Sequence, residues 1–557
     1  MAAARGGGRG ELRTYADVED YFNNMASEGL SAQARIDYIV PHLISLLPPP
    51  GVPAPDADDA SDSDDDHFSL TSSDSESDGA AADADWPAVV QAAQDDGQDH
   101  ISRLTNDLLS NIISRLPTKE AARTMLLSAR WRCVWAATPL LVDDAHLRAA
   151  RESREMSAFG VVRAVSRCVA AHPGPIRAVR ITRISFHNQE YALQGLVASL
   201  AAKKVQDLIL FNRPWPLNMP LPDGIRSCAS LTRLYIGIWH WLWHFPDTTA
   251  RRPAFPNLHE LGIFHTIIED KEVDALLRHC PKLKILSFAM EWYKCPTRLR
   301  IKSRSLVVVM EWRCSFDEVV VDDAPYLERL LFDSIFEPRP IKIVHAPKLE
   351  VLGFLDLQIH MLEIGGFVIK AGMNVRARAM LPSLKILAVK VRFSDDMVVK
   401  MLPTLLRCFP CLETLHIMSI PSGSTDIVDH AELWKSLGSS DCLRSHLKTL
   451  VLHGFKNLDH ELLFLDYILE KGKVLKTLCV VPTESDDVSA EVGPMSGFLL
   501  ERNAPSGGSS GSAISVCPAS RCWSFQRAID LSVEDPFYAP RHDVAWIACR
   551  TEDETAC

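Results

Sequence analysis

The chain has 557 residues, of which 47% are hydrophobic, and this is enough for several domains with apolar cores. Residues 56–99 hold fifteen Asp or Glu and no Lys or Arg, so this window alone accounts for the net charge of −12 and leaves no basic field for nucleic acid. No apolar run reaches the roughly 18 residues that a membrane helix needs, and the first residues lack a signal-peptide core. We therefore expect a soluble, intracellular protein without membrane contact, whose 14 scattered cysteines stay reduced.

Residues 1–47 carry apolar residues at helical spacing, broken near Gly29, which predicts two short amphipathic helices. Such a pair would pack on the next module or on a partner, and the sequence does not decide between them. Residues 48–98 are rich in Pro, Ala, Ser and Asp, and they bury too little apolar area to offset the entropy of ordering. They are predicted to form a disordered acidic linker.

Residues 99–145 predict three helices. Apolar residues from Leu108 to Leu116 recur every three or four positions, which indicates a helix that begins near Asn106 and ends before Pro117. Thr118 is expected to cap a second helix that turns Ala121, Ala122, Met125 and Leu126 inward. A third helix is expected from about Ala129, with Trp131, Val134 and Trp135 apolar and Pro139 closing it. Such a small unit makes a poor core alone.

The stretch LPTKEAARTMLLSARWRCVW after the first helix resembles the F-box of plant proteins. This resemblance implies a module that docks on a Skp1-type adaptor and, through it, on the cullin of a ubiquitin ligase. Thr105 stands where an F-box usually has Pro. The resemblance implies an apolar adaptor-binding face made of Leu104, Leu108, Leu109, Ile112, Leu116, Pro117 and Trp131. The alternative is a small helical bundle that packs only on its own chain.

Residues 146–200 read as a bridging segment of helical pieces and one short strand. Beyond residue 200 the pattern Leu-x-x-Leu-x-apolar repeats at spacings of 21 to 35 residues, often with Pro two positions earlier. Copies cover 205–210, 231–236, 258–263, 283–288, 327–332, 349–354, 384–389, 412–417, 447–452 and 475–480, with a weaker copy from Leu306. Each copy predicts one parallel strand whose leucines are buried only by stacking on neighbours.

The repeats resemble the leucine-rich repeats (LRR) of plant F-box proteins over 201–444, but the asparagine of the regular form is absent. Helical returns are expected at 270–283 and 396–412, and irregular returns elsewhere. Residues 445–482 resemble the FBD region that closes many such proteins, and 483–557 are expected to be partly flexible. The predicted fold class is α/β, with a three-helix F-box followed by an irregular solenoid of parallel strands.

No motif in the sequence is specific enough to predict a catalytic, metal or cofactor site. Cys408 and Cys411 have CxxC spacing without a second ligand pair. His240 and His244 lack the Glu of a zinc protease, and their aromatic stretch is expected to pack on the edge of the solenoid. No phosphate-binding glycine loop or nucleophile elbow occurs in a strand-to-helix context. We therefore expect no cofactor and no catalysis by the chain itself.

These resemblances imply a substrate-recognition subunit of an SCF-type (Skp1-cullin-F-box) ubiquitin ligase in the nucleus or cytoplasm. The alternative is an LRR interaction scaffold with no ubiquitin ligase. By the period-two alternation of strands, several apolar side chains are expected to point out of the concave face and to bind an unknown target protein. The candidate target-binding residues are Phe211, Tyr235, Phe264, Leu331, Leu355 and Met418, with Ile209, Ile285, Val351, Ile386 and Val451 in the same outward set. The alternative is that the C-terminal region or an insertion folds back and covers them.

Overall fold

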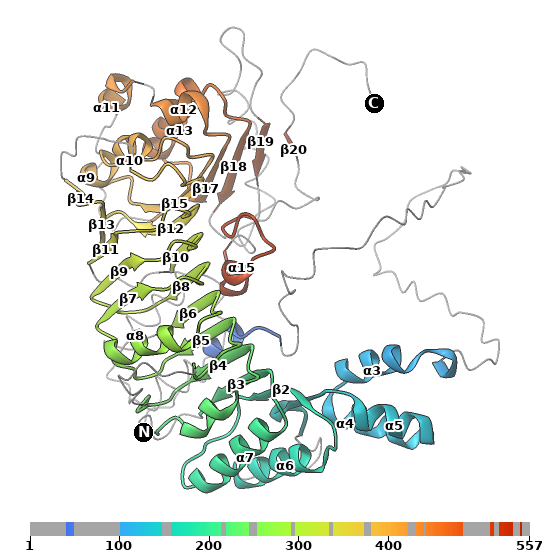
Figure 1. Cartoon of the computed structure of the whole chain (residues 1–557). Coiled ribbons are helices and arrows are strands. Elements are labelled where there is room, and N and C mark those ends of the chain that lie inside the picture. The colour runs from blue at the N-terminus through green and yellow to red at the C-terminus, as the bar shows by residue number, and fades with distance from the viewer. Residues whose placement is uncertain are drawn as a thin grey trace, which may run out of the picture.

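The structure is a computed structural model, which describes residues 40–49, 101–147, 158–212, 219–243, 253–290, 296–333, 338–372, 380–420, 431–438, 440–482, 513–516, 523–538 and 546–547. It is a curved stack of parallel strands with the helices of residues 101–137 at one end (Figure 1). The first predicted N-terminal helix, almost all of the acidic segment and residues 483–512 lie outside the described residues.

Three helices follow the predicted pattern at the N-terminal end of the stack. The 3-10 helix η1 (Ile101–Arg103) precedes α3 (Asn106–Arg115), α4 (Thr118–Arg123), the 3-10 helix η2 (Thr124–Leu126) and α5 (Ala129–Ala137). Thr105 is the N-cap of α3, because its hydroxyl accepts the backbone N–H of Leu108 at 3.4 Å. The expected cap on α4 is wrong, since Pro117 occupies that position and the Thr118 hydroxyl donates instead to the carbonyl of Leu141.

The inner sheet has 15 strands, and neighbours in the order pair in parallel except at the last pair. The strands are β1 (Leu140–Asp143), β2 (Ile176–Ile181), β3 (Asp207–Phe211), β4 (Arg233–Gly237), β5 (Glu260–Phe264), β6 (Ile285–Ala289), β8 (Val308–Trp312), β10 (Arg329–Asp333), β12 (Val351–Asp356), β15 (Ile386–Val391), β16 (Thr414–Ser419), β17 (Thr449–Phe455), β18 (Thr477–Pro482), β19 (Ala513–Val516) and β20 (Trp546–Ile547). The predicted repeat strands are confirmed. The sheet begins earlier than predicted, at β1, which comes directly after α5 and pairs in parallel with β2; the 3-10 helix η3 (Asp144–Leu147) follows β1.

The returning segments are helical at the two ends of the stack, as Figure 1 shows. They are α6 (Ala158–Ala171), α7 (Glu190–Ala202), the 3-10 helix η4 (Asp223–Ser227), α8 (Asp270–His279), α9 (Asp396–Val399), α10 (Leu402–Cys408), α11 (Ala431–Ser436), α12 (Asp441–Ser445) and α13 (Asp459–Lys471). The helical returns expected at 270–283 and 396–412 are confirmed. One further short helix, α15 (Phe525–Ile529), lies on the opposite side of the inner sheet.

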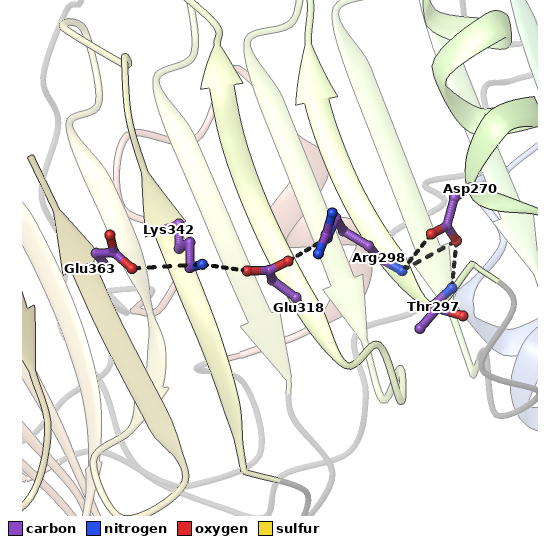
Figure 2. Close-up of polar contacts among 6 residues, drawn as sticks. All are labelled: Asp270, Thr297, Arg298, Glu318, Lys342 and Glu363. Carbon is purple, nitrogen blue, oxygen red and sulfur yellow. Dashed lines mark hydrogen bonds and ion pairs between the residues drawn. The ribbon is translucent and has the colours of Figure 1, made fainter. Parts of the chain in front are cut away.

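In the middle of the stack the returns are strands, which the sequence reading did not predict. They form an outer sheet of β7 (Arg298–Lys302), β9 (Glu318–Asp323), β11 (Arg339–Ile343), β13 (His360–Ile364) and β14 (Phe367–Ile369). Figure 2 shows a polar ladder across this sheet. Asp270 accepts the backbone N–H of Thr297 at 2.7 Å, while Glu318 pairs with Arg298 and, at 2.8 Å, with Lys342. The hydrogen bond from Lys342 is the main reason why the pKa of Glu318 lies below its usual value.

A repeated backbone corner takes the place of the missing asparagine ladder. Ile238, His265, Met290 and Arg313 each follow the end of an inner strand with φ between 46° and 62°. Each of their backbone N–H groups donates to the carbonyl that ends the next inner strand, at 2.6 to 3.0 Å. The chain therefore turns through a left-handed residue at each of these repeats and satisfies that residue's N–H through the backbone of the neighbouring repeat.

The inner sheet lies between the apolar core of the solenoid and the apolar side chains of the concave face. The core runs from Leu109 in α3 to Val480 in β18, so the helices of 101–137 and the repeats share it. The leucines expected to point inward, such as Leu208, Leu234 and Leu286, belong to it. The larger cluster on the concave face includes Val40, Leu43 and Leu47 from the N-terminal segment and Phe525, Ile529 and Phe537 from the C-terminal segment.

Candidate functional site

Helix α3 has two apolar faces rather than one. Leu109 and Ile113 are fully buried, four residues apart, and they hold α3 on the shared core. Leu108 and Ile112 each precede one of these residues, so they lie about 100° around the helix and remain 52% and 41% exposed. This helix therefore presents a second apolar stripe to the outside.

Three more exposed apolar side chains belong to the same module. Ile101 in η1 is 56% exposed, and Leu126 and Leu127 after α4 are 85% and 65% exposed. The expectation that Leu126 turns inward is wrong, because α4 ends at Arg123 and the chain tightens into η2. We call Ile101, Leu108, Ile112, Leu126 and Leu127 the exposed apolar patch. Five large exposed apolar side chains on one small module are typical of an interaction surface.

The seven predicted adaptor-binding residues divide by burial. Leu108, Ile112 and Pro117 are exposed, Leu104 and Leu116 are partly buried, and Leu109 and Trp131 are buried in the core. The last two can therefore shape the face only by packing beneath it. Sequence reasoning missed Ile101, Leu126 and Leu127. The adjacent pair Leu126-Leu127 carried a signal, because consecutive residues point about 100° apart and cannot both line one helix face.

Polar contacts fix this module in place. The Arg130 guanidinium in α5 donates to the side-chain oxygen of Asn106 at 2.9 Å and also to the carbonyl of Leu104, which ties α5 to the start of α3. At the other side, Nε2 of His172 donates to the carbonyl of Thr138 at 2.9 Å. Because burial lowers the pKa of His172, its imidazole is neutral and keeps this bond at physiological pH. The patch is thus held in a fixed orientation to the repeats.

The concave face of the repeats is covered, so the expectation of an open apolar surface is wrong. Among the predicted target-binding residues, Phe211, Tyr235, Phe264 and Leu331 are at most 1% exposed. Ile209, Ile285, Val351, Ile386 and Val451 of the same outward set are also buried, while Met418 is partly buried. The physical reason is that helix 40–46 and residues 523–538 lie on this face and bury its side chains. The alternative of a C-terminal fold-back is confirmed, and the N-terminal segment packs there too.

Leu355 does not point to the concave face as expected. It belongs to the core inside the solenoid, whereas Phe354 points to the concave face, the reverse of the expected alternation. The strand pairing of β12 with β15 shifts register between Leu352 and Leu355, and this bulge moves every following side chain to the other face. Sequence alternation alone carries no sign of such a shift.

The other motifs behave as structural elements. Trp239, Trp241 and Trp243 are at most 2% exposed, and the indole N–H groups of Trp239 and Trp243 donate to the carbonyls of Leu210 and Leu221. This confirms that the aromatic stretch packs on the solenoid, and it leaves these rings unavailable to a target. Cys408 is buried, and burial raises the pKa of several other thiols, to about 12 for Cys280.

Within the described ranges, no three His, Cys, Asp or Glu side chains are grouped so as to hold a metal ion. The described helices include none that is both long and apolar enough to cross a membrane. The helices of residues 101–137 share one apolar core with the leucine-rich solenoid. The two features of functional interest are an exposed apolar patch and a covered concave face.

Comparison with known families gives the same division of the chain. An F-box domain model matches residues 101–142, and a model of the LRR repeats of the FBD-associated F-box protein At5g56370 matches 193–417. An FBD model matches residues 437–480. The chain therefore carries an F-box, leucine-rich repeats and an FBD region, and its predicted resemblance to plant F-box proteins is confirmed.

The chain is similar to F-box proteins of Arabidopsis thaliana. The chain is 23% identical over 439 residues to the F-box/LRR-repeat protein At5g02910, covering 69% of this chain and 89% of that protein. It is 24% identical over 427 residues to the putative F-box/FBD/LRR-repeat protein At3g49480, covering 70% and 90%. A third, the F-box/LRR-repeat protein 13, is 25% identical over 304 residues, covering 53% and 60%.

Proposed function

We propose that this protein is a substrate-recognition subunit of an SCF-type ubiquitin ligase in the nucleus or cytoplasm. The F-box binds a Skp1-type adaptor and through it the cullin, and the repeats hold the target protein. The observation that carries this proposal is the exposed apolar patch, because five large apolar side chains face solvent on a module of fewer than fifty residues. Burial of Leu108, Ile112, Leu126 and their neighbours by an adaptor removes this apolar surface from water.

The role of the chain in this proposal is positioning, not catalysis. The ubiquitin-charged enzyme of the ligase supplies the chemistry, and this subunit raises the local concentration of the target beside it. Such a role requires a fixed geometry between adaptor and target. The shared core from Leu109 to Val480 and the contacts of Arg130, Thr118 and His172 supply that geometry.

Adaptor capture tests the proposal. Full-length protein is expected to retain a purified Skp1-type adaptor, and the double variant Leu108→Asp/Ile112→Asp is expected to lose it. Two carboxylates would have to be desolvated in an apolar interface, which costs several kcal/mol, or about a thousandfold or more in affinity. Folding should not change, since both side chains are exposed.

A matched control is Leu242→Asp/Leu458→Asp, which places the same charges at leucines that are 50% and 43% exposed outside the F-box. This control should bind the adaptor like the wild type. If the wild-type protein captures no adaptor, the result would contradict this proposal and favour the alternative of an LRR interaction scaffold without a ubiquitin ligase.

A further inference from the structure

Residues 523–538, which cover part of the concave face, do not belong to the core of the repeats. The apolar side chains that fill the solenoid form one continuous cluster, and those on the concave face form two others on the other side of the inner sheet. Residues 523–538 contribute to the clusters of the concave face and not to the cluster that fills the solenoid. These residues also stand outside the hydrogen-bonded strand order of both sheets. The solenoid thus has a complete core without residues 523–538, which we call the C-terminal segment.

The C-terminal segment attaches through aromatic rings at three places. The ring of Trp523 stacks on Trp312 with centroids 5.6 Å apart, and Phe525 meets Phe264 edge-on at 5.4 Å. Further along, Phe537 meets Phe354 at 4.9 Å. Offset and edge-on pairs of this kind add to the apolar burial. In Figure 1 the segment, with α15, lies across the middle of the inner sheet.

The polar contacts of the C-terminal segment involve both its backbone and one of its side chains. Arg329, the first residue of β10, donates to the backbone carbonyls of Asp530, at 2.9 Å, and Val533. The carboxylate of Asp535 lies 3.0 Å from Nε2 of His416. The other ring nitrogen of His416, Nδ1, lies 3.2 Å from Nε2 of His453. The hydrogen bonds from Arg329 recognise the peptide backbone, and the bond between His416 and Asp535 recognises one acidic side chain.

The fit of the C-terminal segment is incomplete. The indole N–H of Trp523 and the Nε–H of Arg527 are both buried, and among the described residues neither has a hydrogen-bond acceptor. A buried donor without an acceptor keeps its full desolvation cost. A peptide that presents the same aromatic and acidic groups without these two donors would avoid that cost.

We propose that the concave face from β5 to β16 is a peptide-binding groove and that residues 523–538 are its built-in occupant. The partner is a segment of another protein with two aromatic side chains separated by one residue, followed by an acidic residue and a further aromatic. This deepens the proposed function, on which it rests for calling that partner a ubiquitination target. The tethered occupant competes with the partner at an effective concentration of about millimolar, so the groove is closed in the resting protein.

The test uses the full chain and a fluorescein-labelled peptide with the sequence of residues 523–538. In the variant Trp523→Ser/Phe537→Ser the built-in segment is weakened, and the labelled peptide is expected to bind at least about tenfold more tightly than to the wild type. Adding Arg329→Ala to that variant should weaken binding again, because the peptide carbonyls lose their donor. Thermal unfolding should remain a single cooperative transition, since the solenoid core is untouched.

A folded variant that fails to bind the peptide would overturn the proposal. Amide exchange of the wild-type protein guards against a variant that does not fold. Amides of 525–529 should exchange by local opening, faster than those of 308–312 beneath them. Equal protection of both stretches would show that the segment is a permanent part of the fold. Adaptor capture by the same proteins is a separate readout, so loss of the groove and loss of the ligase role can be told apart.

Discussion

The molecule has two apolar surfaces, of which one is exposed and the other is covered. On the F-box, Leu108, Ile112, Leu126 and Leu127 face solvent, and no described residue of the chain covers them. On the concave face of the repeats, Phe211, Tyr235 and Phe264 are as apolar but lie beneath residues brought from both ends of the chain. Apolar composition therefore marks where a surface needs a partner, and only the fold shows whether the chain already provides one.

The largest expected effect concerns a buried residue of the concave face. Phe264 contacts the rings of Phe211, Tyr235 and Phe525 at centroid distances of 5.4 to 5.7 Å. Phe264→Ser should lower the free energy of unfolding by about 3 kcal/mol or more, because it leaves a cavity lined by these rings. Chemical denaturation measures the loss, and adaptor affinity should not change. A stability within about 0.5 kcal/mol of the wild type would mean that this face is open in solution.

A smaller effect is expected on the exposed patch. Leu126 is 85% exposed, so Leu126→Asp should leave unfolding unchanged and reduce adaptor affinity by about 10- to 100-fold, which calorimetric titration can measure. Leu531→Asp, at a leucine that is 41% exposed on the C-terminal segment, is a control with the same charge. If the two variants bind the adaptor equally well, η2 lies outside the interface.

The concave face also has an expected pH dependence. Burial, and then the charge of neighbouring His416, lower the pKa of His453 from 6.5 to about 3, while Asp535 opposes the shift. Below pH 6.5 the unfolded chain binds a proton at His453 that the native protein refuses, so stability falls as the pH falls. Between pH 7.5 and 5.5 the wild type should lose about 1.4 kcal/mol more than His453→Phe.

Two other groups do not disturb that comparison. Burial raises the pKa of Glu311 to about 7, so the native state gains a proton there as the pH falls, but it does so in both proteins. Burial alone would raise the pKa of Asp535, but the charge and hydrogen bond of His416 outweigh it and place the pKa below 3.8, outside this window. Equal pH dependence of the two proteins would show that position 453 is hydrated.

The smallest effect is expected on the outer sheet, where the charges of Figure 2 lie near solvent. Glu318→Gln should shift the melting temperature by about 2 °C or less, because paired charges at a surface are screened. Raising the salt concentration should shrink the shift further. A large shift that persists at high salt would mean that this ladder contributes to stability as a buried network does.

Local patterns in the sequence were sufficient to predict the elements that are stabilised by near neighbours. The helix from Asn106 and the inward leucines of the repeats were predicted because a period of 3.6 or 2 reports one buried face. The outer sheet was missed although Arg298, Arg300 and Lys302 alternate with buried Leu299 and Ile301. These strands lie between the leucine repeats, where irregular connections were expected.

The cover of the concave face could not be predicted in the same way. Arg329 contacts Asp530, and Gln526 donates to the carbonyl of Ser45, across 201 and 481 residues of chain. No periodicity within either segment indicates which strands it will meet. The exposed patch is an intermediate case, because the motif indicated Leu108 and Ile112, whereas Leu126 depended on where α4 ends.

Hydrogen–deuterium exchange of the full chain, alone and with a Skp1-type adaptor, tests most directly whether the exposed surface is the interface and the covered one is not. We expect slower exchange on binding in α3 and in residues 124–128, with no change in strands β5 to β12. Protection that falls on those strands, or no protection in α3 when the adaptor is bound, would contradict this expectation.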